Sequence, residues 1–132
     1  MIVDANVLLR ALEGGASAQA RAVRRRIEAA RESSEKLAVL SATVLEVAYV
    51  LESEPAGYGW ERVDVARAIE AVLDEPAFSV QHHHALRDAT AVYRSRSIDL
   101  HDCLLSAIAT ERNDRVLSFD KDLRKLGNAE QP

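Results

Sequence analysis

Four acidic residues stand where an apolar segment meets or enters a predicted helix. They are Asp4 in MIVDANVLL, Glu46 in SATVLEVAYVL, Asp102 in SIDLHDCLLSAIA and Asp120 in RVLSFDKDLRKL. Withdrawing an unpaired carboxylate from water among aliphatic side chains is costly, and a divalent cation shared by all four would keep them ionised. Oxygen donors select a hard ion, so the pattern predicts Mg²⁺, with Mn²⁺ as the alternative. Such a site favours hydrolysis of a phosphodiester or another phosphorylated molecule by metal-activated water.

Each acid also has a structural interpretation. Asp4 and Asp120 are good N-cap residues for the helices that follow them, and Glu46 could lie on a solvated helix face. Asp99 and Asp102 imitate a capping box, but that box normally has Glu or Gln at its third helical position. We therefore interpret Asp99 as the cap and Asp102 as functional.

The apolar patterns predict alternating strands and helices. The expected strands span 1–3, 37–40, 78–80 and 115–119, and the expected helices span 6–12, 17–32, 42–53, 61–74, 83–96 and 99–111, with a short last helix from 120. Ser41 is the expected cap of the helix at 42–53. Helical crossovers between strands imply parallel pairing, so the predicted fold is a three-layer α/β/α sandwich with a parallel central sheet of four or five short strands. The carboxyl ends of such strands share one edge, where ligands gather.

Composition indicates one domain, residues 1–132. The apolar content of 48% suffices for a core. With 17 basic against 21 acidic residues, the net charge gives no indication of nucleic-acid binding. The single Cys103 excludes an internal disulfide and suits a reducing compartment. No apolar run approaches the roughly 20 residues that span a bilayer. We therefore expect a cytoplasmic protein with no membrane partner.

Other catalytic and binding motifs fail. The five glycines form neither a P-loop nor a dinucleotide-binding motif, and no G-x-S-x-G nucleophile elbow is present. The consecutive histidines 82–84 point in different directions on a helix, so we interpret them as a polar helix start rather than a metal site. His101 and Cys103 are expected to pack near the start of their helix.

The four acidic segments together resemble the PIN-domain ribonuclease family, most closely its VapC-type toxins from prokaryotic toxin–antitoxin pairs. The resemblance covers nearly the whole chain, through the segments VDANVL, SATVLE, DCLLSA and SFDKDL in that order. Departures are small, with Cys103 in place of the usual Ala and Ser118 in place of the usual Thr. The resemblance implies Mg²⁺-dependent cleavage of RNA, a cognate antitoxin that covers the acidic site, and a homodimer.

The resemblance also assigns roles to individual residues. Asp4 and Asp102 would be the principal metal ligands, and Glu46 and Asp120 would complete the catalytic site. The expected supporting residues are Asn6, Ser118 and Asp122. Asn6 and Ser118 would hold the carboxylates through hydrogen bonds, and Asp122 is an optional fifth acid.

An arginine-rich helix offers a candidate RNA contact. Its residues Arg21, Arg24, Arg25 and Arg31 could bind phosphates. A solvated face in which neighbouring glutamates of the same helix pair with these arginines explains the pattern equally well.

Two other classes of function remain open. One is a non-catalytic PIN-like binding module, which loss of an acid would favour, and none of the four acids is lost. The other is a metal-dependent phosphatase or receiver-like α/β domain. A receiver requires a lysine after a late strand, where this chain has Asp120.

Overall fold

The computed structural model describes residues 1–55 and 57–132. Helices and short strands alternate along these residues in the order α1 Ala5–Leu12, α2 Ala18–Ser33, β1 Leu37–Val39, α3 Ser41–Glu52, α4 Arg62–Asp74, β2 Phe78–Val80, α5 His83–Ser95, α6 Leu100–Glu111, β3 Val116–Leu117, α7 Lys121–Lys125 and β4 Ala129–Glu130. Every predicted helix and strand has a counterpart, with ends that differ by a few residues at most. The first expected strand is reduced to a single bridge at Ile2.

Hydrogen bonds fix the starts of α2 and α3, locally in one case and from a distant residue in the other. The Ser17 hydroxyl accepts from the Ala20 amide at 3.1 Å and caps α2. The expectation that Ser41 caps α3 is wrong, because Leu40 occupies the N-cap position and offers no side-chain acceptor. The Gln81 carboxamide oxygen accepts instead from the Ser41 amide at 3.1 Å and from its hydroxyl at 3.2 Å. The start of α3 is thus capped from the end of β2.

Parallel pairing of short strands is confirmed. β1 pairs with β2 in the register Leu37↔Phe78, and Ile2 forms a parallel bridge to Ala38 on the other side of β1. β3 pairs with β4, so the carboxyl-terminal tail does contribute a strand.

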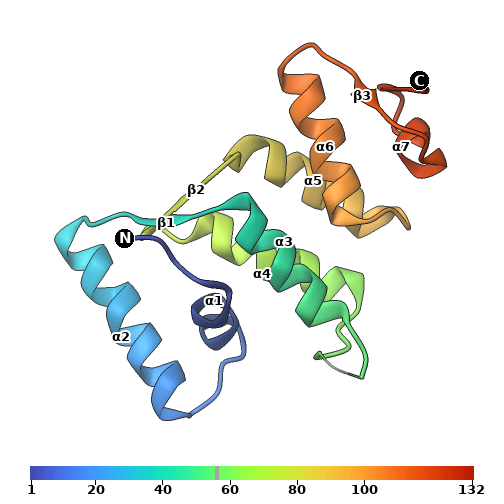
Figure 1. Ribbon diagram of the computed structural model, residues 1–132. Coiled ribbons are helices and arrows are strands. Elements are labelled where there is room, and N and C mark those ends of the chain that lie inside the picture. Colours follow the sequence, from blue (N-terminus) through green and yellow to red (C-terminus); the bar gives the residue numbers. More distant parts are fainter. Residues whose placement is uncertain (56) are drawn as a thin grey trace.

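The described strands form two separate two-stranded sheets rather than the one central sheet that we expected. Figure 1 shows the amino terminus with β1 and β2 in one part of the molecule, and β3 and α7 in another, beyond α6. Strands of two or three residues contribute few backbone hydrogen bonds, so helix packing decides this arrangement. The α/β class holds, while a continuous three-layer sandwich is not formed here.

The core lies between helices. Its fully buried side chains include Leu8 of α1, Leu51 of α3, Ile69 of α4, and Leu86 and Tyr93 of α5. Helix α5 packs against both α4 and α6 and so links the two parts of the molecule. Within the described residues, no helix has the length and apolar character required to cross a membrane.

Candidate functional site

Asp102 is the most buried of the four predicted acids. It lies in the first turn of α6, its side chain is only 17% exposed, and its Oδ1 lies 3.6 Å from Nδ1 of His101. Burial raises the pKa of the Asp102 carboxyl above its ordinary value, the nearby His101 imidazole opposes this, and the negative charges of Asp120 and Asp99 add to the rise. Asp102 and Asp120 therefore lie within electrostatic reach of each other.

Asp120 is fixed at the start of α7. Its Oδ1 accepts from the Asp122 amide at 2.7 Å, which is an N-cap bond. The Ser118 hydroxyl accepts from the backbone amide of Asp120 at 2.9 Å, so Ser118 holds the backbone and not the carboxylate. The Asp122 carboxylate accepts from Lys125 Nζ at 2.8 Å. These bonds hold the Asp120 carboxylate at the start of α7, which packs against α6.

Asp4 and Glu46 lie on the amino-terminal part of the fold. Asp4 is exposed, and its Oδ1 accepts from the Asn6 amide at 2.7 Å, which caps α1. Asn6 holds this carboxylate through its backbone rather than its side chain. Glu46 is exposed on α3.

Of the four predicted acids, Asp120 is near enough to Asp102 for its charge to raise the pKa of the Asp102 carboxyl. Within residues 1–55 and 57–132, no three Asp, Glu, His or Cys side chains lie close enough to hold a metal ion together. Asp4, Glu46 and Asp120 are exposed, so the expectation of carboxylates withdrawn from water holds only for Asp102. Capping a helix places a short side chain at the surface, which explains the exposure of Asp4 and Asp120.

Comparison with known proteins identifies the family of this chain. The sequence matches the PIN domain over residues 1–129. The chain belongs to the PIN-domain family. It is also similar to the "VapC ribonuclease" of Aquifex aeolicus (strain VF5), with 32% identity over 127 residues that cover 96% of this chain and 91% of that protein.

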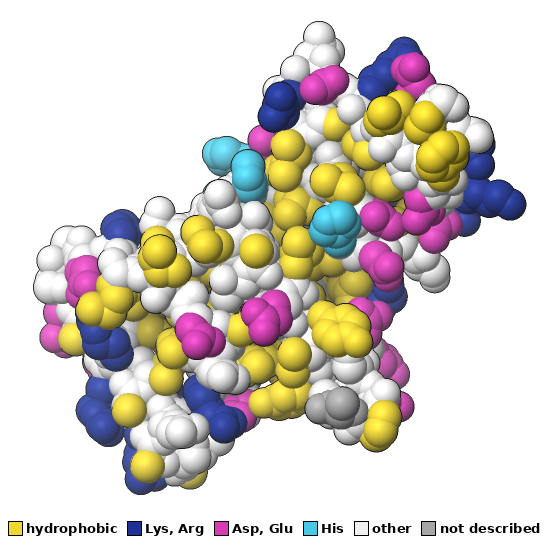
Figure 2. Space-filling model, in the orientation of Figure 1, with side chains coloured by type: hydrophobic (Ala, Val, Ile, Leu, Met, Phe, Trp, Pro, Cys, Tyr) yellow, Lys and Arg dark blue, Asp and Glu magenta, His cyan; other side chains and the backbone are white. Residues whose placement is uncertain are grey.

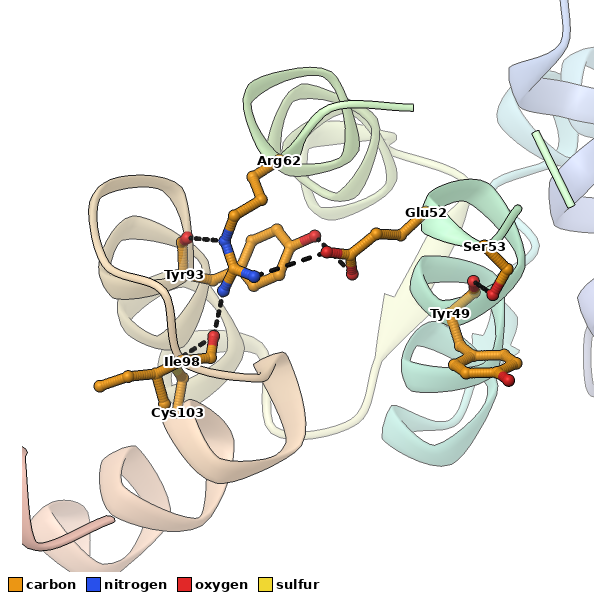
Figure 3. Close-up of polar contacts among 7 residues, drawn as sticks. All are labelled: Tyr49, Glu52, Ser53, Arg62, Tyr93, Ile98 and Cys103. Carbon is orange, nitrogen blue, oxygen red and sulfur yellow. Dashed lines mark hydrogen bonds and ion pairs between the residues drawn. The ribbon is translucent and has the colours of Figure 1, made fainter. Parts of the chain in front are cut away.

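A polar cluster around the buried Tyr93 lies next to the start of the helix that carries Asp102 in this PIN domain (Figure 3). The Arg62 guanidinium lies 4.0 Å from the centroid of the Tyr93 ring and donates to the backbone oxygens of Tyr93, at 3.0 Å, and Ile98. Glu52 lies 3.5 Å from Arg62 and accepts from the Tyr93 hydroxyl at 3.1 Å. Burial and the nearby Glu52 charge raise the pKa of Tyr93. Since Ile98 directly precedes the N-cap of α6, Arg62 fixes the start of the helix that carries Asp102.

Sequence reasoning missed this cluster. Arg62 stands 31 residues from Tyr93 and 10 from Glu52, and none of them lies in a motif. The only sequence signals for the cluster were Arg62 on α4 and Tyr93 on α5, since these helices otherwise direct mainly apolar residues to the core. Cys103, by contrast, packs as expected, since it is buried with a pKa raised by burial to about 11.

Three of the four candidate arginines of α2, Arg21, Arg24 and Arg31, bind groups outside their own helix. Arg31 forms a two-pronged ion pair with Glu75 at 2.7 and 2.5 Å. Arg24 donates to the Gly15 carbonyl at 2.9 Å, and Arg21 donates to the Ala16 carbonyl. The histidine interpretation is supported as well, because His83 begins α5 with its Nε2 3.0 Å from the Leu73 carbonyl oxygen.

Proposed function

We propose that this chain is a metal-dependent endoribonuclease that cleaves RNA phosphodiesters at an acidic site, as the toxin of a toxin–antitoxin pair. The observation that carries this function is the PIN-domain match over residues 1–129 together with 32% identity to a ribonuclease across almost the whole chain. The half-buried Asp102 beside Asp120 is the part of the fold best suited to the chemistry.

The donor set fits Mg²⁺ or Mn²⁺. Mg²⁺ is commonly held by one or two carboxylates together with water and substrate phosphate, and Asp102 and Asp120 supply two. Burial raises the pKa of Asp102 and the negative charges of Asp120 and Asp99 add to the rise, and a bound cation would favour the ionised carboxylate against both effects. When bound, a divalent cation lowers the pKa of water and offsets charge on the phosphate. Asp102 and Asp120 would hold it, and Glu46 would orient the attacking water or accept its proton.

Asp4 would approach Asp102 and Asp120 if the sheet of β1 and β2 paired with the sheet of β3 and β4. Both sheets have an edge that could form this pairing. The Met1 carbonyl and the Val3 amide bond to Ala38, so Ile2 directs its own backbone groups to the opposite edge. The amides of Val116 and Ser118 likewise donate towards β4, which leaves the backbone groups of Leu117 on a free edge.

Those two edges are apolar as well as unpaired within the described sheets. Ile2 is 67% exposed, Leu117 is 70% exposed, and Phe119 beside it is 72% exposed. Exposed apolar edges favour pairing with another strand. Pairing of Ile2 with Leu117 would give one parallel sheet of five short strands and carry Asp4, which follows the first strand, towards Asp120, which follows β3.

The partners follow from the same function. RNA is the proposed substrate, a small antitoxin protein that covers the acidic site is the proposed inhibitor, and a homodimer is the proposed assembly. Arg24 and Arg25, exposed on α2, are the better proposed phosphate contacts, because Glu75 already offsets the charge of Arg31.

The test is cleavage of structured RNA by the purified chain, free of antitoxin, with Mg²⁺ and with EDTA. Asp102→Asn keeps the shape of the side chain and removes its charge, so cleavage should fall by orders of magnitude. Glu111→Gln, at the other end of the same helix, removes one negative charge about 14 Å away along the axis and should leave cleavage intact. Equal activity of wild type and Asp102→Asn would refute the assignment. A wild-type chain that binds RNA but never cleaves it would favour the binding module.

A further inference from the structure

A groove of about 360 Å³ runs between α3 and the start of α6. Its walls include Ala48 and Tyr49 from α3, Ser53 just after it, Leu100 and His101 from α6, and Asp99 just before it. Nδ1 of His101 lies 3.6 Å from Oδ1 of Asp102, so the groove lies next to this half-buried carboxylate. Figure 2 shows acidic and histidine side chains on this face of the molecule, with hydrophobic side chains between them.

The ring of Tyr49 is the notable part of this groove. It is 74% exposed, although α3 is an otherwise apolar helix whose neighbouring positions Val47 and Ala48 are buried. In Figure 3 the ring points away from the cluster of Glu52, Arg62 and Tyr93, so it takes no part in holding the helices together. The other tyrosines are engaged, since Tyr93 is buried and Tyr58 packs edge-on against Trp60 at 6.0 Å.

The chemistry of the walls selects the occupant. An exposed aromatic ring binds the face of an unpaired nucleobase, and such stacking tolerates every base. The carboxylates of Glu52 and Asp99 on the same walls repel phosphate, and the Asp99 carboxylate can accept hydrogen bonds from the amino groups of a neutral base. The side chain of Asp99 is not used to cap α6, so its acceptors remain available at the groove. The lining therefore complements a base rather than the RNA backbone.

We infer that the groove between α3 and α6 is a subsite for one unpaired RNA base next to the cleaved phosphodiester, stacked on Tyr49 and bordered by His101. This subsite rests on the proposed ribonuclease function and adds to it a preference for single-stranded RNA at the cut. The phosphate would lie towards Asp102 and Asp120, and the base would lie between the two helices. Base-specific contacts from the walls would then influence which sequences are cut.

The experiment compares wild type, Tyr49→Phe and Tyr49→Ala in binding to a fluorescently labelled, unstructured RNA in EDTA. Tyr49→Phe keeps the ring and should bind like wild type. Tyr49→Ala should weaken binding by about tenfold, in line with the loss of one stacked base. The slope of affinity against salt should stay unchanged, because no phosphate contact is lost. Thermal unfolding checks that Tyr49→Ala still folds, as expected for so exposed a side chain.

The outcomes separate this inference from the proposed function. Unchanged RNA affinity in a folded Tyr49→Ala variant would overturn the subsite, whether or not wild type cleaves RNA. Weaker self-association or weaker antitoxin binding with unchanged RNA affinity would also overturn it and would assign the groove to a protein partner. Weaker RNA binding in a chain that never cleaves RNA would support the subsite and refute the hydrolase. In an active chain, sequencing of cleavage products from Tyr49→Ala should show a flattened base preference at the cut.

Discussion

Replacement of Arg62 by Met tests whether the cluster around this arginine holds the start of α6. The substitution keeps an unbranched side chain but removes the hydrogen bonds to the Tyr93 and Ile98 carbonyls and the contact with the Tyr93 ring. Hydrogen bonds from a charged donor contribute about 1.5–3 kcal/mol each, and a cation–π contact contributes about 0.5–1 kcal/mol or more. The ion pair with Glu52 adds less than about 1 kcal/mol, because both side chains are partly exposed.

These contributions are not additive, and the methionine stem recovers some packing, so we expect a loss of about 3 kcal/mol in the free energy of unfolding. Urea unfolding of both proteins measures it directly. Tyr93→Phe removes only the bond to Glu52 and should cost about 1 kcal/mol. Arg67→Met is the matched control on the same helix, since Arg67 is 72% exposed and its ion pair with Asp64 is 4.0 Å long.

Activity gives a second measurement on the same variants. If Arg62 positions Asp102, the folded fraction of Arg62→Met should need more Mg²⁺ for half-maximal cleavage than wild type, because the ligand geometry is looser. A loss of unfolding free energy below about 1 kcal/mol, or a loss equal to that of Arg67→Met, would refute the structural reasoning. A large loss of stability with an unchanged Mg²⁺ requirement would leave the cluster structural only.

Two further predictions concern charge. The raised pKa of Asp102 means that the folded state binds the carboxyl proton more tightly than the unfolded state does. Ionised Asp102 therefore destabilises the fold. This loss of stability begins as pH rises above the ordinary aspartate pKa near 4 and is complete above the raised pKa of the folded state. Metal-free Asp102→Asn should therefore be at least as stable as wild type at pH 7 and lose that advantage in acid, as urea unfolding across pH would show. For RNA, Arg25→Ala should weaken binding and flatten its salt dependence more than Arg31→Ala, whose guanidinium is paired with Glu75; equal effects in binding titrations would contradict this.

The order and limits of the helices could be predicted from sequence because they depend on local patterns. The strand at Phe78–Val80 lies where the apolar run predicts it, and α2 begins within one residue of its predicted start at Ser17. The cap of α3 could not be predicted, because its acceptor comes from Gln81, 40 residues away. The same holds for Arg62, whose partners lie on α3, α5 and the loop after α5. Tertiary contacts of this kind leave no periodic signal in the chain.

In the candidate site, too, local features could be predicted from the sequence and tertiary contacts could not. Sequence patterns identify which acids stand at strand ends and helix starts, but not which edges pair, because strands of two or three residues fix their neighbours only through side-chain packing. Asp99 occupies the N-cap of α6 as predicted, yet its side chain makes no cap bond, and the burial of Asp102 depends on how α6 packs. The four acids follow from their positions in the sequence, and the resemblance to PIN domains assigns their roles as metal ligands.

The capping and metal-binding interpretations of Asp4 and Asp120 are compatible. In each residue Oδ1 accepts one backbone amide, from Asn6 and from Asp122, at 2.7 Å in both cases. A carboxylate has two oxygens and about four acceptor positions, so Oδ2 of each remains available to a cation. The cap bond fixes the side-chain direction before any ligand arrives, which lowers the entropy lost on binding. Asp102 has no cap bond to fix it and depends instead on Arg62 and the packing of α6. We therefore expect the Mg²⁺ requirement to be more sensitive to substitutions around Arg62 than to substitutions in the first turns of α1 and α7 that preserve the caps.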